Sequence, residues 1–560
     1  MNHPSYTRGR QDKPLLAMTI GAAFDATSSR FANREALVVR HQNLRYTWAQ
    51  LADTVNAIAR AFLALGLRQG DRVGIWAPNC AQWCITQFAS AKVGAVLVNI
   101  NPAYRTNELE YALKQSGCSW LICADAFKTS DYHGMLGELL PEMADCRPGE
   151  LSSARLPELR GVVSLASQAP AGFLRWDQLE AIGAGVSTEE LAEREALLQF
   201  DEPINIQYTS GTTGFPKGVT LSHYNILNNG FMVGESIGLT EHDRLVIPVP
   251  LYHCFGMVMG NLGCLTHGST MIYPSPSFEP EATLQAVAEE RATALYGVPT
   301  MFIAELDHPR RDEFDLSSLR TGIMAGATCP IEVMRRVIGE MHMAEVQIAY
   351  GMTETSPVSL QTGPEDELEI RVTTVGRTQP HLESKIIDGD GRIVPRGTIG
   401  ELCTRGYSVM LGYWNNPQAA MEAVSPARWM LTGDLAVMDD AGNVRIVGRN
   451  KDMIIRGGEN IYPREIEEFL YTHHAVADAQ VIGIPDEKYG EELVAWVKFH
   501  PGHSVVEEEL RAFCKARIAH FKVPRYFRFC DDFPMTVTGK VQKFRMREIS
   551  IEELRAGKTG

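Results

Sequence analysis

The chain has 560 residues, of which 45% are hydrophobic and 22% charged, and its formal net charge is −15. This length exceeds one ordinary domain and predicts two to four lobes with ample apolar material for a core. The acidic balance excludes a general nucleic-acid coat, and the sequence has no 18-residue apolar window that would predict a membrane span.

Cysteine usage indicates a reducing compartment. The 11 cysteines are scattered and include no C-x-x-C pair, so we interpret them as reduced, mostly buried thiols. His473 and His474 have no neighbouring cysteine and are a weak metal signal. The apolar piece 14–20 is too short for a convincing signal peptide, which makes a cytoplasmic enzyme the default. Peripheral contact with a membrane and formation of an oligomer both stay open.

Helical and strand patterns alternate over residues 20–200. Thr47 is a candidate cap for a helix that carries one apolar stripe. The stripe consists of Leu51, Val55, Ile58, Phe62 and Leu65. Strands are expected at 72–76 and 94–100, with a helix over 82–91 between them. This order is typical of α/β structure with a largely parallel sheet.

Residues 128–172 lose this periodicity and gather Pro, Gly and Ser, so we expect irregular surface excursions there. Between about 200 and 350 the alternation returns, with a helix start near Leu221. The strands expected in this part are 204–208, 244–249, 269–273 and 294–298.

The residue pattern changes again over 380–448, where short β runs are split by Gly and Asp. A small β-rich lobe or distorted barrel is expected there. A charged stretch at 448–452 then precedes a self-contained α+β unit, which is typical of an interdomain hinge. The elements expected in that unit are a helix from Pro463, strands at 477–484 and 492–499, and a helix opened by the capping box 504–507.

The most informative segment is 208–218, Tyr-Thr-Ser-Gly-Thr-Thr-Gly-Phe-Pro-Lys-Gly. Its glycines let backbone N–H groups approach a ligand, and its hydroxyls and Lys217 suit phosphate oxygens. It is not a Walker A loop, because its lysine follows a proline instead of a glycine. The segment predicts a polyphosphate loop, with a flexible turn between strand and helix as the alternative.

Five further segments follow this loop in the chain. They are 250–256 (Pro-Leu-Tyr-His-Cys-Phe-Gly), 325–328 (Ala-Gly-Ala-Thr), 350–354 (Tyr-Gly-Met-Thr-Glu), 432–434 (Thr-Gly-Asp) and 534–540 (Pro-Met-Thr-Val-Thr-Gly-Lys). In this order, across nearly the whole chain, they resemble the adenylate-forming superfamily. The resemblance is to its acyl-CoA synthetase branch, and most of all to medium- and long-chain fatty acyl-CoA synthetases.

The resemblance implies a large α/β N-terminal domain over 1–448, made of two α/β subdomains and a small β-barrel-like lobe. A hinge at 449–452 with Lys451 at its centre, and a small mobile α+β lid over 453–560, would complete the fold. The implied reaction joins a fatty acid to CoA through an acyl-AMP intermediate. It uses ATP, Mg²⁺ and CoA and no nucleic acid.

The same resemblance implies roles for individual residues. Thr209, Glu354 and Lys540 would be catalytic, and Glu354 would hold Mg²⁺. The implied ATP- and AMP-binding residues are Thr209, Ser210, Gly211, Thr212, Thr213, Gly214, Lys217, Gly326, Ala327, Thr328, Tyr350, Gly351, Met352, Thr353, Asp434, Arg449 and Lys540. Asp434, with Arg449 as its partner, would bind the ribose. His253, Phe255, Gly326 and Gly351 would contact the acid, and Gly457 and Gly458 would line the CoA path.

The substrate is less closely defined. Similar acetate-activating enzymes carry a tryptophan where this chain has Gly351, so we expect an acid larger than acetate and a shift towards short acids in Gly351→Trp. The segment 101–111 is similar to medium- and long-chain synthetases. An aryl- or branched-acid CoA ligase, an acyl-AMP ligase that loads a carrier protein, a silent binding protein and a luciferase-like oxygenase stay open.

Overall fold

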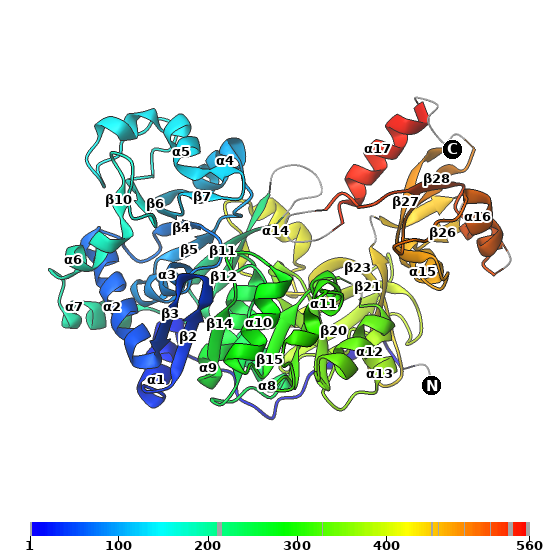
Figure 1. Ribbon diagram of the computed structural model, residues 1–560, viewed down its shortest axis with the longest axis horizontal. Coiled ribbons are helices and arrows are strands. Elements are labelled where there is room, and N and C mark those ends of the chain that lie inside the picture. The colour runs from blue at the N-terminus through cyan, green and yellow to red at the C-terminus, as the bar shows by residue number, and fades with distance from the viewer. Residues whose placement is uncertain are drawn as a thin grey trace. The chain divides into compact units, whose positions relative to one another are not determined.

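The computed structural model (Figure 1) describes residues 3–209, 216–327, 329–449, 452–456, 459–486, 488–515, 517–535 and 541–555. The chain divides into two compact units, which we describe separately. Unit 1 comprises Met1–Tyr6, Lys385–Cys403 and Leu431–Gly560, and unit 2 comprises Thr7–Ser384 and Thr404–Met430. The domain limits 448/449 and 452/453 stay a prediction.

Unit 2 is built on two large, mostly parallel sheets. The eight-stranded sheet has the order β10 (Leu174–Arg175), β9 (Gly161–Ser164), β6 (Cys118–Cys123), β4 (Arg72–Trp76), β5 (Val96–Asn99), β11 (Pro203–Thr209), β12 (Lys217–Ser222), β22 (Gly412–Tyr413). The nine-stranded sheet has the order β19 (Arg377–Thr378), β18 (Val358–Gln361), β17 (Glu345–Gly351), β16 (Thr321–Ala325), β15 (Ala294–Gly297), β13 (Arg244–Val246), β14 (Thr270–Tyr273), β2 (Glu35–Val39), β3 (Leu44–Thr47).

Helices flank these sheets. Those of unit 2 are α1 (Ile20–Arg30), α2 (Trp48–Ala64), α3 (Ala81–Val93), α4 (Thr106–Ser116), α5 (Tyr132–Leu139), α6 (Leu179–Gly183), α7 (Thr188–Leu197), α8 (His223–Ser236), α9 (Gly263–His267), α10 (Pro280–Glu290), α11 (Pro299–Leu306), α12 (Ile331–Glu340), α13 (Leu368–Thr373) and α14 (Pro417–Ala423). Helix α2 packs on β2 and β3 of one sheet, α3 packs on β4 and β5 of the other, and the two helices contact each other. Helix α3 is therefore buried on nearly all sides.

Local signals explain several of these elements. Thr47 caps α2 and forms a capping box with Gln50, as the sequence predicts, and the apolar stripe of α2 faces the core. The strands predicted at 72–76, 94–100, 204–208, 244–249, 269–273 and 294–298 correspond to β4, β5, β11, β13, β14 and β15. The prediction of α/β structure with a largely parallel sheet is confirmed.

Two local expectations were wrong, and one was shifted. Residues 128–172 contain α5 and also β9, which pairs with β6 inside the sheet. Strand β12 lies between the glycine-rich loop and α8, so that loop joins two antiparallel strands and not a strand and a helix. The helix predicted after the capping box 504–507 is present as α16 (Glu507–Lys515) but begins at Glu507, because helix ends are set by weak local terms.

Unit 1 is an α+β assembly. Its C-terminal sheet has the order β26 (Glu459–Ile461), β25 (Ile454–Arg456), β28 (Gly490–Phe499), β27 (Val476–Asp486), with β29 (Tyr526–Phe529) beside β28. The helices are α15 (Pro463–Leu470), α16 (Glu507–Lys515) and α17 (Lys543–Arg555). A further sheet has the order β1 (Tyr6–Arg8), β20 (Leu382–Ile387), β21 (Gly400–Gly406), β23 (Met430–Met438), β24 (Val444–Arg449). The predicted helix from Pro463 and the strands near 477–484 and 492–499 are confirmed.

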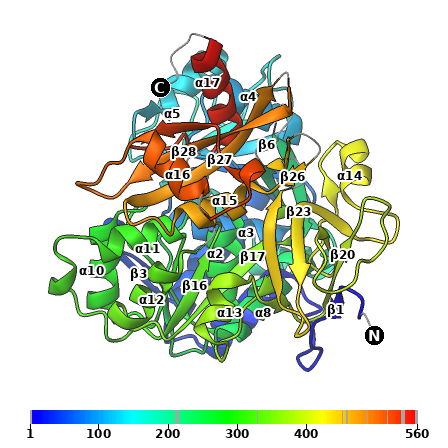
Figure 2. The same cartoon turned by 90° about the vertical axis from the view of Figure 1, so that its right-hand side faces the viewer.

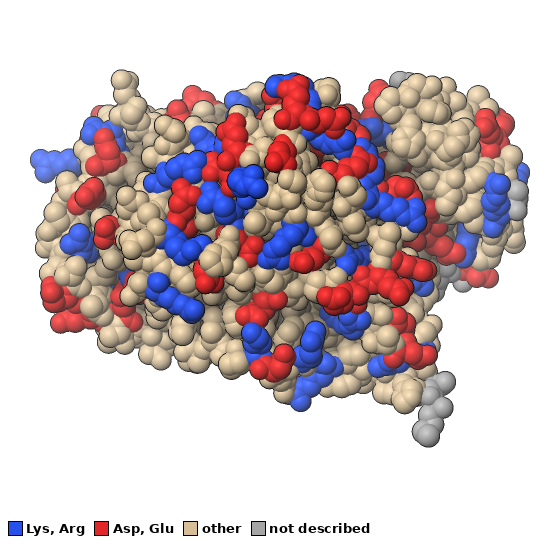
Figure 3. Space-filling model, turned by 60° about the horizontal axis from the view of Figure 1, so that its bottom comes forward, with Lys and Arg blue, Asp and Glu red and all other residues tan. Residues whose placement is uncertain are grey.

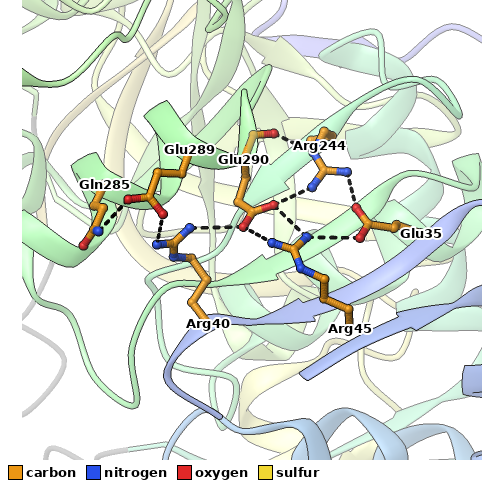
Figure 4. Close-up of polar contacts among 7 residues, drawn as sticks. All are labelled: Glu35, Arg40, Arg45, Arg244, Gln285, Glu289 and Glu290. Carbon is orange, nitrogen blue, oxygen red and sulfur yellow. Dashed lines mark hydrogen bonds and ion pairs between the residues drawn. The ribbon is translucent and has the colours of Figure 1, made fainter. Parts of the chain in front are cut away.

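An ion network around the buried carboxylate of Glu290 ties the edge of the nine-stranded sheet to α10 (Figure 4). The carboxylate of Glu290, only 4% exposed, accepts hydrogen bonds from Arg40, Arg45 and Arg244. Arg244 also pairs with Glu35 at 2.6 Å. Burial alone would raise the pKa of Glu290, but the three guanidinium groups bring it below its ordinary value. The network thus joins the β2–β3 hairpin to β13.

The surface and the thiols agree with the composition. Lys and Arg are interspersed with Asp and Glu on the face that Figure 3 shows. All 11 cysteines are free, and most are buried, as predicted. Within the described ranges, none of the helices combines the length and apolar character needed to cross a membrane.

Candidate nucleotide- and acid-binding site

The glycine-rich loop begins and ends on paired strands of unit 2. Thr209, the last residue of β11, lies opposite Lys217, the first residue of β12. Helix α4 supports both ends: the Tyr111 hydroxyl donates to the Pro216 carbonyl at 3.1 Å, and the Tyr208 hydroxyl donates to Gln115 Oε1 at 2.6 Å. The β11–β12 hairpin therefore places Thr209 and Lys217 side by side at the two ends of the glycine-rich loop.

Lys217 and Glu354 approach the same aromatic side chain. Lys217 Nζ lies 5.0 Å from the ring centroid of Tyr413, and the Tyr413 hydroxyl donates to Glu354 Oε1 at 2.9 Å. Strand β22 places Tyr413 opposite Val219 of β12. Burial, together with the charge of Glu354, raises the pKa of Tyr413 above its ordinary value, so the phenol stays a donor at neutral pH.

Glu354 is held at the end of β17. Thr353 and Glu354 lie in a short 3₁₀ turn, Thr353–Thr355, directly after that strand, and both side chains are buried. The Glu354 carbonyl accepts the Met410 N–H at 2.9 Å. One carboxylate among hydroxyl and phenol groups suits Mg²⁺, which keeps several waters and takes most other ligands from substrate phosphates. The described residues contain no cluster of three or more His, Cys, Asp or Glu that could hold a metal alone.

Two strand ends bring the small residues of the site to one edge. β16 and β17 run parallel, with Ala325 opposite Ala349, and Figure 2 shows them side by side. Gly326 and Ala327, at the end of β16, and Tyr350, at the end of β17, consequently share the carboxyl edge of the nine-stranded sheet. Ligands of open α/β sheets bind at this edge.

Gly351 has a backbone reason to be glycine. A Cβ added there would lie 1.8 Å from the Pro357 carbonyl oxygen and 3.0 Å from Val358 Cα. Met352 N–H donates to the same Pro357 carbonyl at 3.1 Å. Because the chain returns so closely into β18, a side chain at this position would require the Pro357–Val358 backbone to shift, whatever the size of the acid pocket. Gly351→Trp would therefore disturb this turn before it affected the preference for chain length.

The predicted acid-binding segment follows β13 at the same sheet edge. His253 is half-buried, and its Nδ1 accepts the Phe255 N–H at 3.3 Å. Phe255 is buried, with its ring 5.4 Å from that of Tyr296. It begins a π-helix over Phe255–Leu262, a rare form that is frequent at functional sites.

Asp434 and Arg449 form an ion pair in unit 1, as predicted. They lie opposite each other on β23 and β24, and Arg449 Nε donates to Asp434 Oδ1 at 3.0 Å. Asp434 is 7% exposed, whereas the Arg449 side chain is 54% exposed. The segment 432–434 lies inside β23, not at a strand end, and Gly433 has a φ of +71°.

Other predicted residues lie outside the described residues. They are Ser210, Gly211, Thr212, Thr213 and Gly214 of the loop, Thr328, the hinge residue Lys451, Gly457 and Gly458 of the CoA path, and Lys540. Their roles stay predictions. The structure adds Tyr413, which sequence reasoning missed because a Gly-Tyr pair in a β-rich stretch carries no charge or motif that indicates a ligand.

Comparisons with known proteins agree with this geometry. Residues 24–414 match the family model described as AMP-binding enzyme, and residues 465–540 match the one described as AMP-binding enzyme C-terminal domain. The chain is 50% identical to "Putative acyl-CoA synthetase YngI" of Bacillus subtilis (strain 168), over 96% of this chain and 98% of YngI. It is 46% identical to the mitochondrial medium-chain acyl-CoA ligase ACSF2 of Bos taurus, over 97% of this chain and 89% of that protein.

Solved structures are similar over nearly the whole chain. ATP-bound MatB from Rhodopseudomonas palustris aligns with a TM-score of 0.81 and 27% identity, covering 95% of this chain and 99% of MatB. The anthranilate CoA ligase AuaEII in complex with anthranoyl-AMP aligns with a TM-score of 0.82 and 25% identity, covering 98% of this chain and 99% of AuaEII.

Proposed function

Since the chain belongs to the AMP-binding enzyme family, we propose that it is an AMP-forming fatty acid–CoA ligase that acts on medium- to long-chain acids. The single observation that carries this proposal is the convergence of Lys217 and Glu354 on Tyr413. It places a cation and a buried carboxylate together at the end of the glycine-rich loop, where a polyphosphate and its metal need both charges. The relatives named as acyl-CoA ligases support CoA as the acceptor.

In the first half-reaction, the acid carboxylate attacks the α-phosphorus of ATP and pyrophosphate leaves. The carboxylate is already ionised at pH 7, so no enzyme base is required. Lys217 offsets negative charge on the phosphates, and Thr209 and Thr353 offer hydroxyl donors. Glu354 would hold Mg²⁺, which when bound neutralises charge on the polyphosphate. Lys540, by resemblance, adds positive charge at the reacting phosphate.

In the second half-reaction, the CoA thiol attacks the acyl carbonyl, the new thioester forms and AMP leaves. We propose that residues 453–560 turn about Lys451, which withdraws Lys540 and presents Gly457 and Gly458 to the pantetheine arm. Asp434 would accept the ribose hydroxyls through both half-reactions, with Arg449 holding its carboxylate in place.

The acid is proposed to be of medium length because the ACSF2 proteins, 45–46% identical to this chain, are named medium-chain ligases. An aryl acid is the second candidate, because AuaEII acts on anthranilate and aligns over 98% of this chain. We also propose a cytoplasmic location, on the basis of the bacterial relative YngI.

A thioester assay tests the proposal. Purified protein would be given Mg²⁺, ATP and CoA with acetate, octanoate, palmitate, a branched acid or anthranilate. We expect CoA-dependent release of AMP, fastest with octanoate. Pyrophosphate release without CoA-dependent turnover would instead indicate an acyl-AMP ligase. An absence of pyrophosphate with every acid would overturn the proposal.

A further inference from the structure

A chain of buried amide side chains connects the phosphate-loop strand to the predicted acid-binding segment. Asn205 and Gln207 are two residues apart on β11 and so share one face of the strand with Thr209, while Ile204 and Ile206 are buried on the opposite face. Both amides are buried, and Gln207 directly contacts the segment that carries His253. None of these contacts is implied by the resemblance from which the catalytic residues were predicted.

Gln207 makes three side-chain contacts. Its Nε2 donates to Asn205 Oδ1 at 2.8 Å and to Met257 Sδ at 3.2 Å. Its Oε1 accepts from Cys254 Sγ at 3.0 Å. Burial raises the pKa of the Cys254 thiol to about 12, so the thiol is an uncharged donor at neutral pH. Gln207 is therefore hydrogen-bonded to Cys254, the residue that follows His253.

The chain of amides continues to the residue that precedes His253. Asn205 Nδ2 donates to Asn99 Oδ1 and to the Leu97 carbonyl, both at 2.9 Å. Asn99 Nδ2 in turn donates to the Tyr252 carbonyl at 2.9 Å and to Met257 Sδ at 3.1 Å. Both side-chain amide hydrogens of Asn99, Asn205 and Gln207 therefore have acceptors. The Met257 thioether accepts from both Asn99 and Gln207.

The backbone of the segment 250–257 is constrained by its own hydrogen bonds and by a close contact at Gly256. Gly256 and Met257 both donate their N–H groups to the His253 carbonyl, at 3.0 and 3.1 Å. A Cβ on Gly256 would lie 2.5 Å from the Pro250 carbonyl oxygen. Removing one member of a satisfied buried network leaves its partner without a hydrogen bond. The segment would then have to shift as a unit.

From these contacts we infer that Gln207 is a positioning residue, which keeps His253 in register with Thr209 so that the acid meets the α-phosphate. This inference rests on the proposed adenylation. It assigns Gln207 to the first half-reaction only, because that step alone needs the acid and the polyphosphate aligned. A displacement of about 1 Å at such a site can cost about 100-fold in rate.

Gln207→Met tests the inference, because methionine keeps the volume and removes the acceptor for Cys254. We expect acid-dependent pyrophosphate exchange to fall about 10- to 100-fold in kcat/KM, while thioester formation from supplied octanoyl-AMP and CoA stays near wild type. Asn228→Leu is the matched control. Asn228 is also a buried amide, bonded to the Leu16 carbonyl at 3.0 Å, and its loss should lower Tm without separating the two half-reactions.

A second pair of variants addresses the contact itself. Cys254→Ser keeps a donor to Gln207 and should retain exchange, whereas Cys254→Ala should lose as much exchange as Gln207→Met, with little added loss in the double variant. Equal loss of both half-reactions in Gln207→Met, or a fall in Tm alone as in the control, would overturn the inference. Wild-type protein inactive with every acid would instead refute the proposed function.

Discussion

The Tyr413 hydroxyl lies 2.9 Å from Glu354 Oε1 and donates a hydrogen bond to it. The same ring has Lys217 Nζ 5.0 Å from its centroid. Tyr413 thus contacts Glu354, the proposed metal ligand, through its hydroxyl. It contacts Lys217, which is proposed to bind phosphate, through the face of its ring. One side chain sets the spacing between the cation and the carboxylate that the nucleotide requires.

Tyr413→Phe should separate these two contacts. The ring and its cation–π contact remain, but Glu354 loses a charge-assisted hydrogen bond, which is worth about 1.5–3 kcal/mol. We expect the Mg²⁺ concentration for half-maximal adenylation to rise about tenfold, with a small change in Tm. The measurement is pyrophosphate exchange over a Mg²⁺ titration at saturating ATP.

Tyr111→Phe serves as the comparison, because the phenol that it removes donates to the Pro216 carbonyl. Its Mg²⁺ titration should match that of wild type. Superimposable curves for Tyr413→Phe and wild type would contradict a role for Tyr413 in holding Glu354.

Asp434→Asn tests ribose recognition. The amide offers one acceptor oxygen in place of two and no longer carries the charge that pairs with Arg449 at 3.0 Å. We expect the KM for ATP to rise about tenfold, equivalent to about 1.4 kcal/mol, with less effect when 2′,3′-dideoxy-ATP is the substrate. Asp440→Asn, an exposed position in the same hairpin, should leave the KM unchanged. An equal response to ATP and the dideoxy analogue would rule out the ribose contact.

Glu290→Gln tests the ion network of Figure 4. Breaking a buried pair typically costs about 3–5 kcal/mol, and we expect about 3 kcal/mol here because Arg45 is half-exposed and can reach water. Urea unfolding at pH 7 measures the loss. Glu289→Gln changes an exposed carboxylate, 53% accessible, that bonds Arg40, and should cost less than about 1 kcal/mol.

The network also has a pH signature. The folded-state pKa of Glu290 is lowered, so its stabilisation is fully present above the unfolded pKa and disappears as the pH falls through the folded pKa. The difference in unfolding free energy between wild type and Glu290→Gln should shrink in that acidic window. A difference that stayed constant down to the acid transition would argue against an ionised Glu290.

For Glu305 on α11 we expect the opposite pH dependence of the unfolding free energy. Its side chain is 1% exposed, and neither carboxylate oxygen has a hydrogen-bond partner among the described residues. Burial raises the pKa of Glu305 well above its ordinary value of 4.5. Above pH 4.5 the unfolded chain releases this proton while the folded chain retains it, so stability falls as the pH rises until the folded pKa is reached.

Glu305→Met removes that penalty and nearly conserves volume. We expect the variant to exceed wild type in unfolding free energy at pH 8 by more than it does at pH 5, as measured by urea unfolding at both values. Glu313→Met, at an exposed position in unit 2, is the control. A gain that did not increase with pH would mean that the carboxyl of Glu305 is not held neutral.

Many features were predictable from the sequence because they depend on near neighbours. The cap at Thr47 and the strand 72–76 follow from local residue types, as does the helix from Pro463. The thiols of the scattered cysteines were correctly expected to be buried. The region 128–172 was misjudged because β9 is stabilised by its parallel neighbour β6 and not by a strong pattern of its own.

By itself the sequence determined the set of chemical groups: a loop rich in glycine and hydroxyls, its lysine, Glu354 and Asp434 were all identifiable by type and order. Only the tertiary structure decided which partners each of these groups contacts. The antiparallel register places Thr209 opposite Lys217, strand β22 brings Tyr413 to both Lys217 and Glu354, and buried amides join Gln207 to Cys254. Such partners are set by strand register and by burial away from water, which depend on contacts between distant segments and leave no periodic trace in the chain.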